Sequence, residues 1–372
     1  MRALVLNTVD KSTTVQDVSE PEPGPKEILV RVRAVALNHV DFMNAIRPMA
    51  AQEKRVLGSD FAGEVAQVGK DLVGFDDPRA KIGVRVSGFV QGASSVNDRP
   101  GAFAEYVAID YDLTWNIPDK VSFEEAASVS LGAVTAAQGV FERLQLPSPF
   151  SETGVSEQRS TREDEPISVF IYGASSSVGL YAAQLVRLSG KTSGRKIRLI
   201  GAASPSKHAL LDRRQFAAGG EGAQYAIDAI SQGSTVEETD SVIKSGGKFA
   251  IFRAPAAGNF DIAKLKTKPI FGAVWEALGV EVQYHGGVTI PANTKARAFG
   301  AALYKYLGSG VESGQIKLYP NPIRVMPGGL EKIPSDGFAL LSGSFKPVKQ
   351  DQKDTTGHLG PISGEKIIYV VS

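Results

Sequence analysis

The chain contains no cysteine and only four histidines among its 372 residues. Without cysteine it has no disulfide, no thiolate nucleophile and no sulfur ligand for zinc. No segment approaches the roughly 18 apolar residues of a membrane-spanning helix, and the N-terminal stretch MRALVLNTVDKSTTVQDV lacks the apolar core of a signal peptide. Because 41 basic side chains nearly cancel 40 acidic ones, we expect neither a nucleic acid nor a membrane as partner. These absences favour a cytoplasmic globular protein.

The length exceeds the ~250–300 residues at which a single core stops growing, so we expect two domains. Residues 1–135 contain short apolar runs separated by Gly, Pro and Asp, which is typical of an antiparallel, barrel-like domain. The clearest runs cover residues 28–35, 63–68, 85–89 and 103–108. The stretch 123–144, rich in Ala, Glu and Leu, predicts a helix.

Beyond the polar stretch 147–166, strand and helix patterns alternate. A strand at 167–172 is followed by a helix at 178–189, which Gly190 can end, and by a strand at 197–202. The alternation continues with a helix at 207–217 and strands at 225–230, 248–252 and 280–284. This order predicts a doubly wound parallel sheet. A helix at 295–307, a polar stretch at 346–361 and a strand at 366–371 complete the chain.

The most specific local motif is GASSSVG, from Gly173 to Gly179, directly after the strand at 167–172. Ala174, Ser176 and Gly179 stand where the dinucleotide-binding fingerprint G-x-G-x-x-G has its glycines. Taken alone, such a loop is more often a plain β–α turn. The strand before it, the amphipathic helix after it and a second strand about 20 residues on favour a pyrophosphate-binding loop.

The end of the second strand indicates which dinucleotide binds. NAD-specific folds place Asp or Glu there to accept the ribose 2′-OH. Here no acid is within reach, and Ser204 and Lys207 could bind a 2′-phosphate instead. NADPH is therefore favoured, although Ser204 also fits a plain helix cap, which itself binds anions.

Several segments together resemble the medium-chain dehydrogenase/reductase superfamily over nearly the full chain. They are ALNHVD at 36–41, LGSDFAGEV at 57–65, GAFAEYV at 101–107, the loop above and SGEKI at 363–367. The resemblance implies an α/β fold, in which a GroES-like β-barrel catalytic domain (1–135 and 295–372) surrounds a Rossmann doubly wound parallel sheet (136–294). Zinc alcohol dehydrogenases of this superfamily carry Cys and His ligands where this chain has Asn38 and Ser59, so we expect no metal site.

Segments at 147–150, 205–207, 271–276 and 322–326 are most similar to the zinc-free quinone-oxidoreductase-like branch, especially the stand-alone enoyl reductases of fungal polyketide biosynthesis. That likeness implies Asp41 and Thr135 as candidate catalytic residues. It implies cofactor contacts by Val40, Met43, Gly173, Ser175, Ser176, Ser177, Val178, Gly179, Ser204, Lys207, Phe252, Arg253, Ile362 and Ser363. It implies an acyl pocket lined by Leu131, Gly132, Ala133, Val134, Ala136, Ala137, Gly272, Ala273, Val274, Trp275 and Glu276.

For several of these residues a structural role is an open alternative. Asp41 could brace its loop through backbone N–H groups, Thr135 could be a hydroxyl on a helix surface, and Trp275 could pack in the core. His39 adjoins the expected site, yet a packed or solvent-facing histidine is the favoured interpretation.

Two departures from the branch bear on activity. Met43 stands where the family often has a lysine, and only 22 residues separate the second strand from the third, which leaves room for one βα unit fewer. Three hypotheses remain open: an NADPH-dependent reductase of enoyl thioesters or enones, a quinone or alkenal reductase, and an inactive NADPH-binding partner protein. The first implies a free or carrier-bound unsaturated acyl substrate and a polyketide synthase partner, and either a monomer or a homodimer is compatible with it.

Overall fold

The computed structural model describes residues 1–49, 52–96, 99–150, 166–204, 222–284, 287–343, 358–362 and 364–371. The chain divides into two compact units, Met1–Leu131 with Trp275–Ser372, and Gly132–Val274. Compared with the boundaries expected from the sequence, residues 132–135 belong to the second unit and residues 275–294 to the first.

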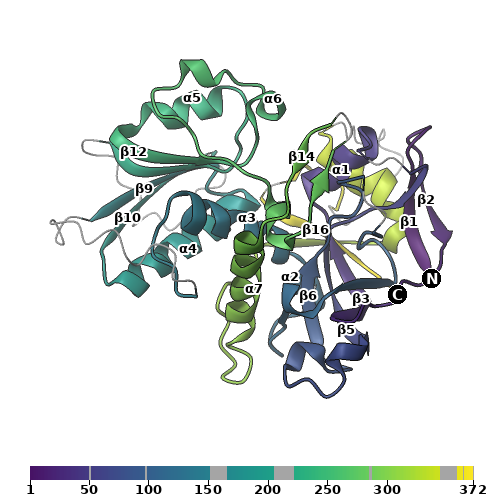
Figure 1. The fold of residues 1–372 in the computed structure, drawn as a ribbon. Helices are drawn as coiled ribbons and strands as arrows, with labels where there is room; N and C mark the ends of the chain where they lie inside the picture. Colours follow the sequence, from purple (N-terminus) through teal and green to yellow (C-terminus); the bar gives the residue numbers. More distant parts are fainter. Residues whose placement is uncertain are drawn as a thin grey trace. The chain divides into compact units, whose positions relative to one another are not determined.

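The first unit is built mainly from antiparallel strands (Figure 1). Over the described ranges, its large sheet has the order β15-β16-β3-β5-β6-β8, and β7 pairs with β3. The bounds are β3 Glu27–Ala36, β5 Asp60–Val68, β6 Arg85–Phe89, β7 Tyr106–Asp110, β8 Thr114–Asn116, β15 Ile323–Met326 and β16 Lys366–Val370. A smaller sheet has the order β2-β1-β4, with β1 Arg2–Asn7, β2 Thr13–Asp17 and β4 Lys54–Val56.

Strand β3 lies at the centre of the large sheet and pairs with strands from both the N-terminal part and the C-terminal end of the chain. It pairs antiparallel with β5 and β7, and also with β16 from the C-terminal end of the chain. Because it is covered on both faces, its sequence EILVRVRAVA is almost continuously apolar, and only Arg31 is exposed. The pairing with β16 brings the last strand beside residues 34–36.

Helices and short turns cover the sheets of both units. The helices are α1 His39–Ile46, α2 Phe123–Ala127, α3 Ser130–Ala137, α4 Ser177–Ser193, α5 Ser234–Ser241, α6 Pro255–Gly258, α7 Thr294–Gly308 and α8 Phe338–Leu341. The 3₁₀ turns are Lys70–Leu72, Pro78–Ala80, Tyr111–Leu113, Ile262–Lys264, Val274–Leu278 and Gly329–Lys332, and the π-helical turns are Gln138–Arg143 (η4) and Ile333–Gly337. The single helix predicted at 123–144 is therefore divided into α2, α3 and η4.

The second unit contains the predicted parallel sheet, in the order β10-β9-β11-β12 for the residues that are described. Its strands are β9 Ile167–Tyr172, β10 Ile197–Ala202, β11 Ala223–Asp228 and β12 Ile243–Ile251, and all three pairings are parallel. Helix α4 covers one face and α5 the other (Figure 1). The strand order reverses between β9 and β11, and such a switch point is where open α/β sheets bind ligands, at the carboxyl ends of the strands.

Two expectations about this unit were wrong. The strand expected at 280–284 is not in the parallel sheet; β13 Val282–Gln283 pairs antiparallel with β14 Thr289–Ile290 in the first unit. The physical reason is that Val282 is buried between two exposed neighbours, a pattern typical of a half-exposed ribbon and not of a strand covered on both faces.

Helix α4 does not end at Gly190 as expected. It continues to Ser193 and ends at Gly194, which has the left-handed conformation (φ 69°). Gly190 lies inside the helix. Glycine is needed at this position because a Cβ atom would lie 2.5 Å from the Ile197 side chain on the adjacent strand. The predicted helix at 207–217 lies outside the described residues.

Candidate functional site

The loop between β9 and α4 has the shape of a pyrophosphate cradle. Gly173 has φ +68°, a conformation that glycine adopts without strain. A Cβ atom at Gly179 would lie 2.2 Å from the Gly173 carbonyl oxygen, so no other residue fits without backbone movement. The Ser176 hydroxyl caps α4 by accepting a hydrogen bond from the Gly179 N–H at 3.1 Å. The close backbone approach and the open first turn of α4 fit a dinucleotide phosphate.

The predicted cofactor residues of this loop differ in what their side chains do. The Ser176 hydroxyl is engaged in the cap, while Ser175, Ser177 and Val178 are partly exposed along the start of α4. A Cβ atom at Gly132 would lie 3.2 Å from the Ser177 Oγ atom, so α3 packs closely against this turn. The structure thus brings Gly132, in the predicted acyl segment 131–137, beside the cofactor loop.

Four other residues of that segment are fully buried, although residues that line a pocket usually expose part of their side chains. Ala133, Val134, Ala136 and Ala137 have no exposed surface. Thr135 is 9% exposed, which excludes the alternative of a hydroxyl on a solvent-facing helix surface.

A hydrogen-bonded turn at the carboxyl end of β11 was missed by sequence reasoning. The Asp228 carboxylate accepts hydrogen bonds from the N–H groups of Ile230 and Ser231, both at 2.8 Å, and from the Thr235 hydroxyl at 2.6 Å. Burial raises the pKa of Asp228 despite these bonds. The Ser231 Oγ atom accepts a hydrogen bond from the Phe252 N–H at 2.9 Å, which joins the ends of β11 and β12. An aspartate near the end of a predicted strand was the available signal.

Arg143, on η4, joins predicted cofactor and substrate residues of the second unit. Its guanidinium donates to the carbonyl oxygens of Ile251 at 2.9 Å and Gly272 at 2.8 Å, and it lies 5.3 Å from the centre of the Phe252 ring. A Cβ atom at Gly139 would come within 2.8 Å of the same ring, so glycine is needed for this packing. Arg143, which the sequence did not indicate, is therefore a neighbour of both Phe252 and Gly272.

The remaining predicted residues of this unit that the structure describes are partly buried or exposed. Arg253 donates to the Gln232 side chain at 2.9 Å, and burial lowers its pKa. Ser204 is exposed just beyond β10, and Ala273 and Val274 are partly buried. Lys207 lies outside the described residues.

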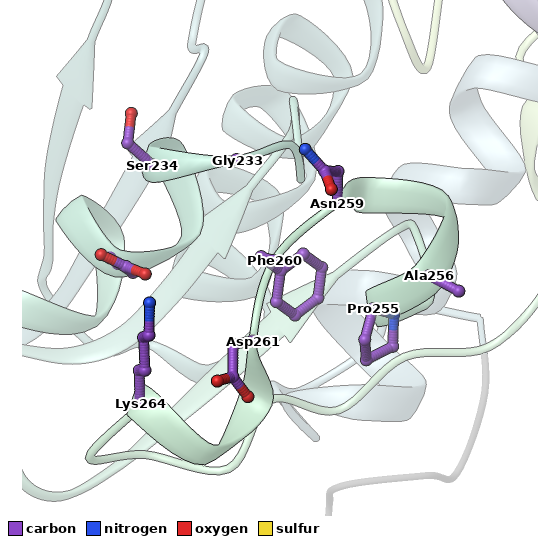
Figure 2. Close-up of a pocket in the computed structure, with 9 residues that line it drawn as sticks. Gly233, Ser234, Pro255, Ala256, Asn259, Phe260, Asp261 and Lys264 are labelled. Atoms are coloured by element: carbon purple, nitrogen blue, oxygen red, sulfur yellow. The ribbon is translucent and has the colours of Figure 1, made fainter.

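A hollow of about 570 Å³ lies on the α5 face of this unit (Figure 2). Gly233 and Ser234 of the α5 start line it together with α6 residues, and Lys264 and Asp261 lie at its other side. None of the predicted cofactor or substrate residues that the structure describes lines this hollow. It is therefore separate from the site that the sequence indicates.

The first unit contains a buried polar cluster at the start of α1. Asp41 is 1% exposed; one carboxylate oxygen accepts from the Ser59 hydroxyl at 2.7 Å and the other from the Asn38 backbone N–H at 2.7 Å. Burial raises the pKa of Asp41 to about 7, against the lowering effect of these hydrogen bonds. This geometry fits the bracing alternative, because one oxygen holds the entry into the helix and the other joins it to Ser59.

A second carboxylate, Asp60 at the start of β5, extends the cluster. One oxygen accepts from the Leu131 N–H at 2.8 Å, and the other from the Asn38 amide at 3.0 Å and the Lys366 ammonium at 3.2 Å. Lys366 also donates to the Asn38 amide oxygen. Sequence reasoning missed both charged residues as site residues, although each lies in a segment that carried the family resemblance.

The other predicted residues of the first unit differ in how far they are buried. Val40 and Met43 are partly buried on α1, and Glu276 and Ile362 are also partly buried. Trp275 is buried with its ring 6.0 Å from that of Phe89, as its core-packing alternative expects. Ser363 lies outside the described residues, and His39 is exposed.

The positions at which zinc ligands would stand are engaged in the chain's own hydrogen bonds. Asn38 binds Asp60 and Lys366, and Ser59 binds Asp41. Within the described ranges, no group of three or more His, Cys, Asp or Glu side chains could hold a metal ion. The same part of the chain contains no helix long and apolar enough to cross a membrane.

Comparisons with known proteins agree with this architecture. Residues 24–119 match the alcohol dehydrogenase GroES-like domain. Enoyl reductase cheB of Chaetomium globosum is 31% identical over 88% of this chain and 86% of its own length. Trans-enoyl reductase ACTTS2 of Alternaria alternata is 30% identical over 94% of this chain and 97% of its own length.

Solved structures support the fold. An alcohol dehydrogenase superfamily protein from Novosphingobium aromaticivorans has a TM-score of 0.68 at 20% identity, and both chains are fully covered. CurK enoyl reductase also has a TM-score of 0.68, at 17% identity over 100% of this chain and 99% of its own. A GroES-like domain with a parallel-sheet unit inserted in it defines a class of oxidoreductases. The chain belongs to the medium-chain dehydrogenase/reductase superfamily, on its enoyl-reductase-like branch.

Proposed function

We propose that the chain is a trans-acting, NADPH-dependent and zinc-independent enoyl reductase, which reduces the C=C bond of an α,β-unsaturated thioester carried by a polyketide synthase. The observation that supports this most is the glycine cradle between β9 and α4, in a chain whose fungal relatives are named enoyl reductase and trans-enoyl reductase. The enoyl substrate follows from those names, and the polyketide synthase partner is what the sequence resemblance to enoyl reductases of fungal polyketide biosynthesis implies.

The second unit offers the groups that would hold the cofactor. The N–H groups at the start of α4 and the Ser175 and Ser177 hydroxyls can donate to the pyrophosphate. Ser204 follows β10, where an NAD-specific fold has an acid, and Lys207 follows it in the sequence. NADPH, when bound, supplies a hydride for the β-carbon of the enoyl group.

The chain's own groups must then stabilise the charge that develops on the thioester oxygen. When the β-carbon gains a hydride, the C=C pair shifts to join the α-carbon to the carbonyl carbon and the carbonyl π pair moves onto oxygen. The resulting enolate can be held by a few N–H or O–H donors. A proton from solvent or a nearby acid on the α-carbon completes the reaction. Thr135 is our candidate donor, whereas both Asp41 oxygens are engaged in the brace of α1. Zinc is not required, since an enolate needs less stabilisation than an alkoxide.

The test is NADPH oxidation on enoyl thioesters, enones, quinones and simple alcohols, with products identified by mass. We expect reduction of the enoyl thioester, and deuterium from 4-deuterated NADPH at its β-carbon. The Gly179→Ala variant, in which the added methyl group meets the Gly173 carbonyl, serves as the cofactor-binding control. Reduction of quinones alone would identify a quinone reductase, and inactivity on every compound would favour a non-enzymatic NADPH-binding protein.

A further inference from the structure

Four segments distant in sequence meet at the carboxylate of Asp60. We call Asp60, Asn38, Lys366 and the Leu131 backbone N–H the Asp60 junction. Asp60 has no exposed surface, and Lys366 and Asn38 are 5% and 9% exposed. The junction joins the starts of α1, β5, α3 and β16, and its two charged residues are 306 positions apart.

Building on the proposed function, we propose that Asp60 and Lys366 are positioning residues of enoyl reduction. The junction fixes the start of α1, which carries the nicotinamide-side residues Val40 and Met43, relative to the acyl-side residue Leu131. Neither charged residue is proposed to touch the substrate. They act through Asn38 and through the backbone of Leu131.

The two oxygens of Asp60 serve different segments. One binds the Leu131 N–H at 2.8 Å, and the other binds the Asn38 amide at 3.0 Å. Because a carboxylate is planar and rigid, these bonds set the separation of the two segments. Misplacement of reacting groups by about 1 Å can cost roughly 100-fold in rate, so a fixed separation matters to catalysis.

Stability alone explains this ion pair poorly. Removing two charges from water costs roughly several kcal/mol per ion. Well-packed neutral residues of similar volume often stabilise a fold as much as a buried ion pair does, or more. What the pair adds is a defined geometry. Lys366 binds both Asp60 and the Asn38 amide oxygen, which fixes the orientation of the Asn38 side chain at the N-terminus of α1.

The test uses Asp60→Asn, which keeps an oxygen for the Leu131 N–H but turns amide hydrogens toward the donors of Asn38 and Lys366. We expect kcat to fall roughly 10- to 100-fold. The KM for NADPH should change less than about threefold, because the loop at 173–179 in the second unit is untouched. This split between kcat and KM is not expected from a purely structural defect.

A second substitution makes the test a rescue experiment. In Asp60→Asn with Lys366→Met, the ammonium is gone and the Asn38 amide can turn over to accept from the new amide. We expect this pair to recover at least about tenfold of the lost kcat and to unfold near the wild-type denaturant concentration. The matched control is Arg33→Met with Glu64→Gln, a pair at 2.7 Å that joins β3 to β5 and is about one-third exposed. It should leave kcat unchanged.

Hydrogen exchange supplies a readout that needs no activity. The amides of α1 should lose protection in Asp60→Asn and regain it in the double variant, and the control should change neither. Unchanged kcat and unchanged exchange in Asp60→Asn would overturn the proposal, as would a loss of kcat that only follows the folded fraction. A wild-type chain inactive on every enoyl thioester would contradict the proposed function instead, and exchange at α1 would then decide the junction on its own.

Discussion

The pH dependence of stability should report the buried carboxyl group of Asp41. Burial raises its pKa from 3.8 to about 7 in the folded chain. Between these values the folded state binds a proton that the unfolded state has lost, so this group's contribution to stability falls as the pH rises. At 1.36 kcal/mol per pH unit, the interval from 3.8 to about 7 corresponds to roughly 4 kcal/mol.

The Asp41→Asn variant removes this titration and resembles the protonated acid. Its amide oxygen can accept from the Asn38 N–H while its NH2 group donates to the Ser59 hydroxyl oxygen, as the carboxylic acid of the folded wild type does at low pH. The variant should therefore be about as stable as the wild type near pH 4 and more stable than the wild type near pH 8.

The chain contains a suitable reporter for this measurement. Its two tryptophans, Trp115 and Trp275, are both buried in the first unit, as is Asp41. Urea unfolding followed by tryptophan fluorescence from pH 4 to 8 thus monitors the unit that carries the substitution, even if the second unit unfolds separately.

Asp77 is a control of opposite sign in the same unit. Burial acts to raise its pKa, but hydrogen bonds and the charge of Arg79 outweigh burial and lower it. Asp77→Asn should therefore lose stability relative to the wild type as the pH rises toward 3.8, and the difference between the two should stay constant over most of the interval in which Asp41 titrates. If the stability difference between Asp41→Asn and the wild type is constant from pH 4 to 8, the reasoning about Asp41 is refuted.

Further predictions concern the cofactor and the metal. Gly179→Ala should abolish NADPH binding, whereas Gly194→Ala at the other end of α4, where a Cβ meets no atom within 4 Å, should cost only about 1–2 kcal/mol of stability through its left-handed backbone. NADPH should bind at least about tenfold tighter than NADH in a fluorescence titration, and Ser204→Asp with Lys207→Ala should narrow or reverse that preference. Arg324→Met should raise the KM for NADPH by about three- to tenfold, because Arg324 binds three backbone carbonyls and a carboxylate of the segment that leads into β16. Dialysis against a chelator should leave activity unchanged, and about one zinc per chain by elemental analysis would contradict the assignment.

Local sequence patterns predicted the parallel sheet well. Strands at 167–172 and 197–202 have the predicted bounds, because each is a short apolar run between turn-forming residues. The end of α4 was predicted four residues early, since glycine both ends helices and permits close packing. Only the structure shows that Gly190 makes room for Ile197.

The candidate site was predictable where it depends on a contiguous motif. The loop at 173–179 contains its own turn and helix start, and both were predicted from the sequence to within one residue, whereas the Ser176 cap was not. Arg143 and Asp60 were not predicted, because each acts on backbone groups between 71 and 129 positions away. No local pattern indicates such a partner, since an arginine or aspartate in these segments fits a solvated surface equally well.

On the proposed zinc-independent mechanism, the charges around Asn38 and Ser59 must be balanced without a metal ion. Two buried carboxylates, Asp41 and Asp60, lie beside the positions where zinc alcohol dehydrogenases have ligands. Lys366 balances one of them, and a pKa of about 7 allows Asp41 to hold a proton near neutral pH. One ammonium and one proton together supply the two positive charges that a divalent ion would have brought. Removing Lys366 alone should therefore raise the pKa of Asp41 further, because the positive charge that now lowers it would be gone.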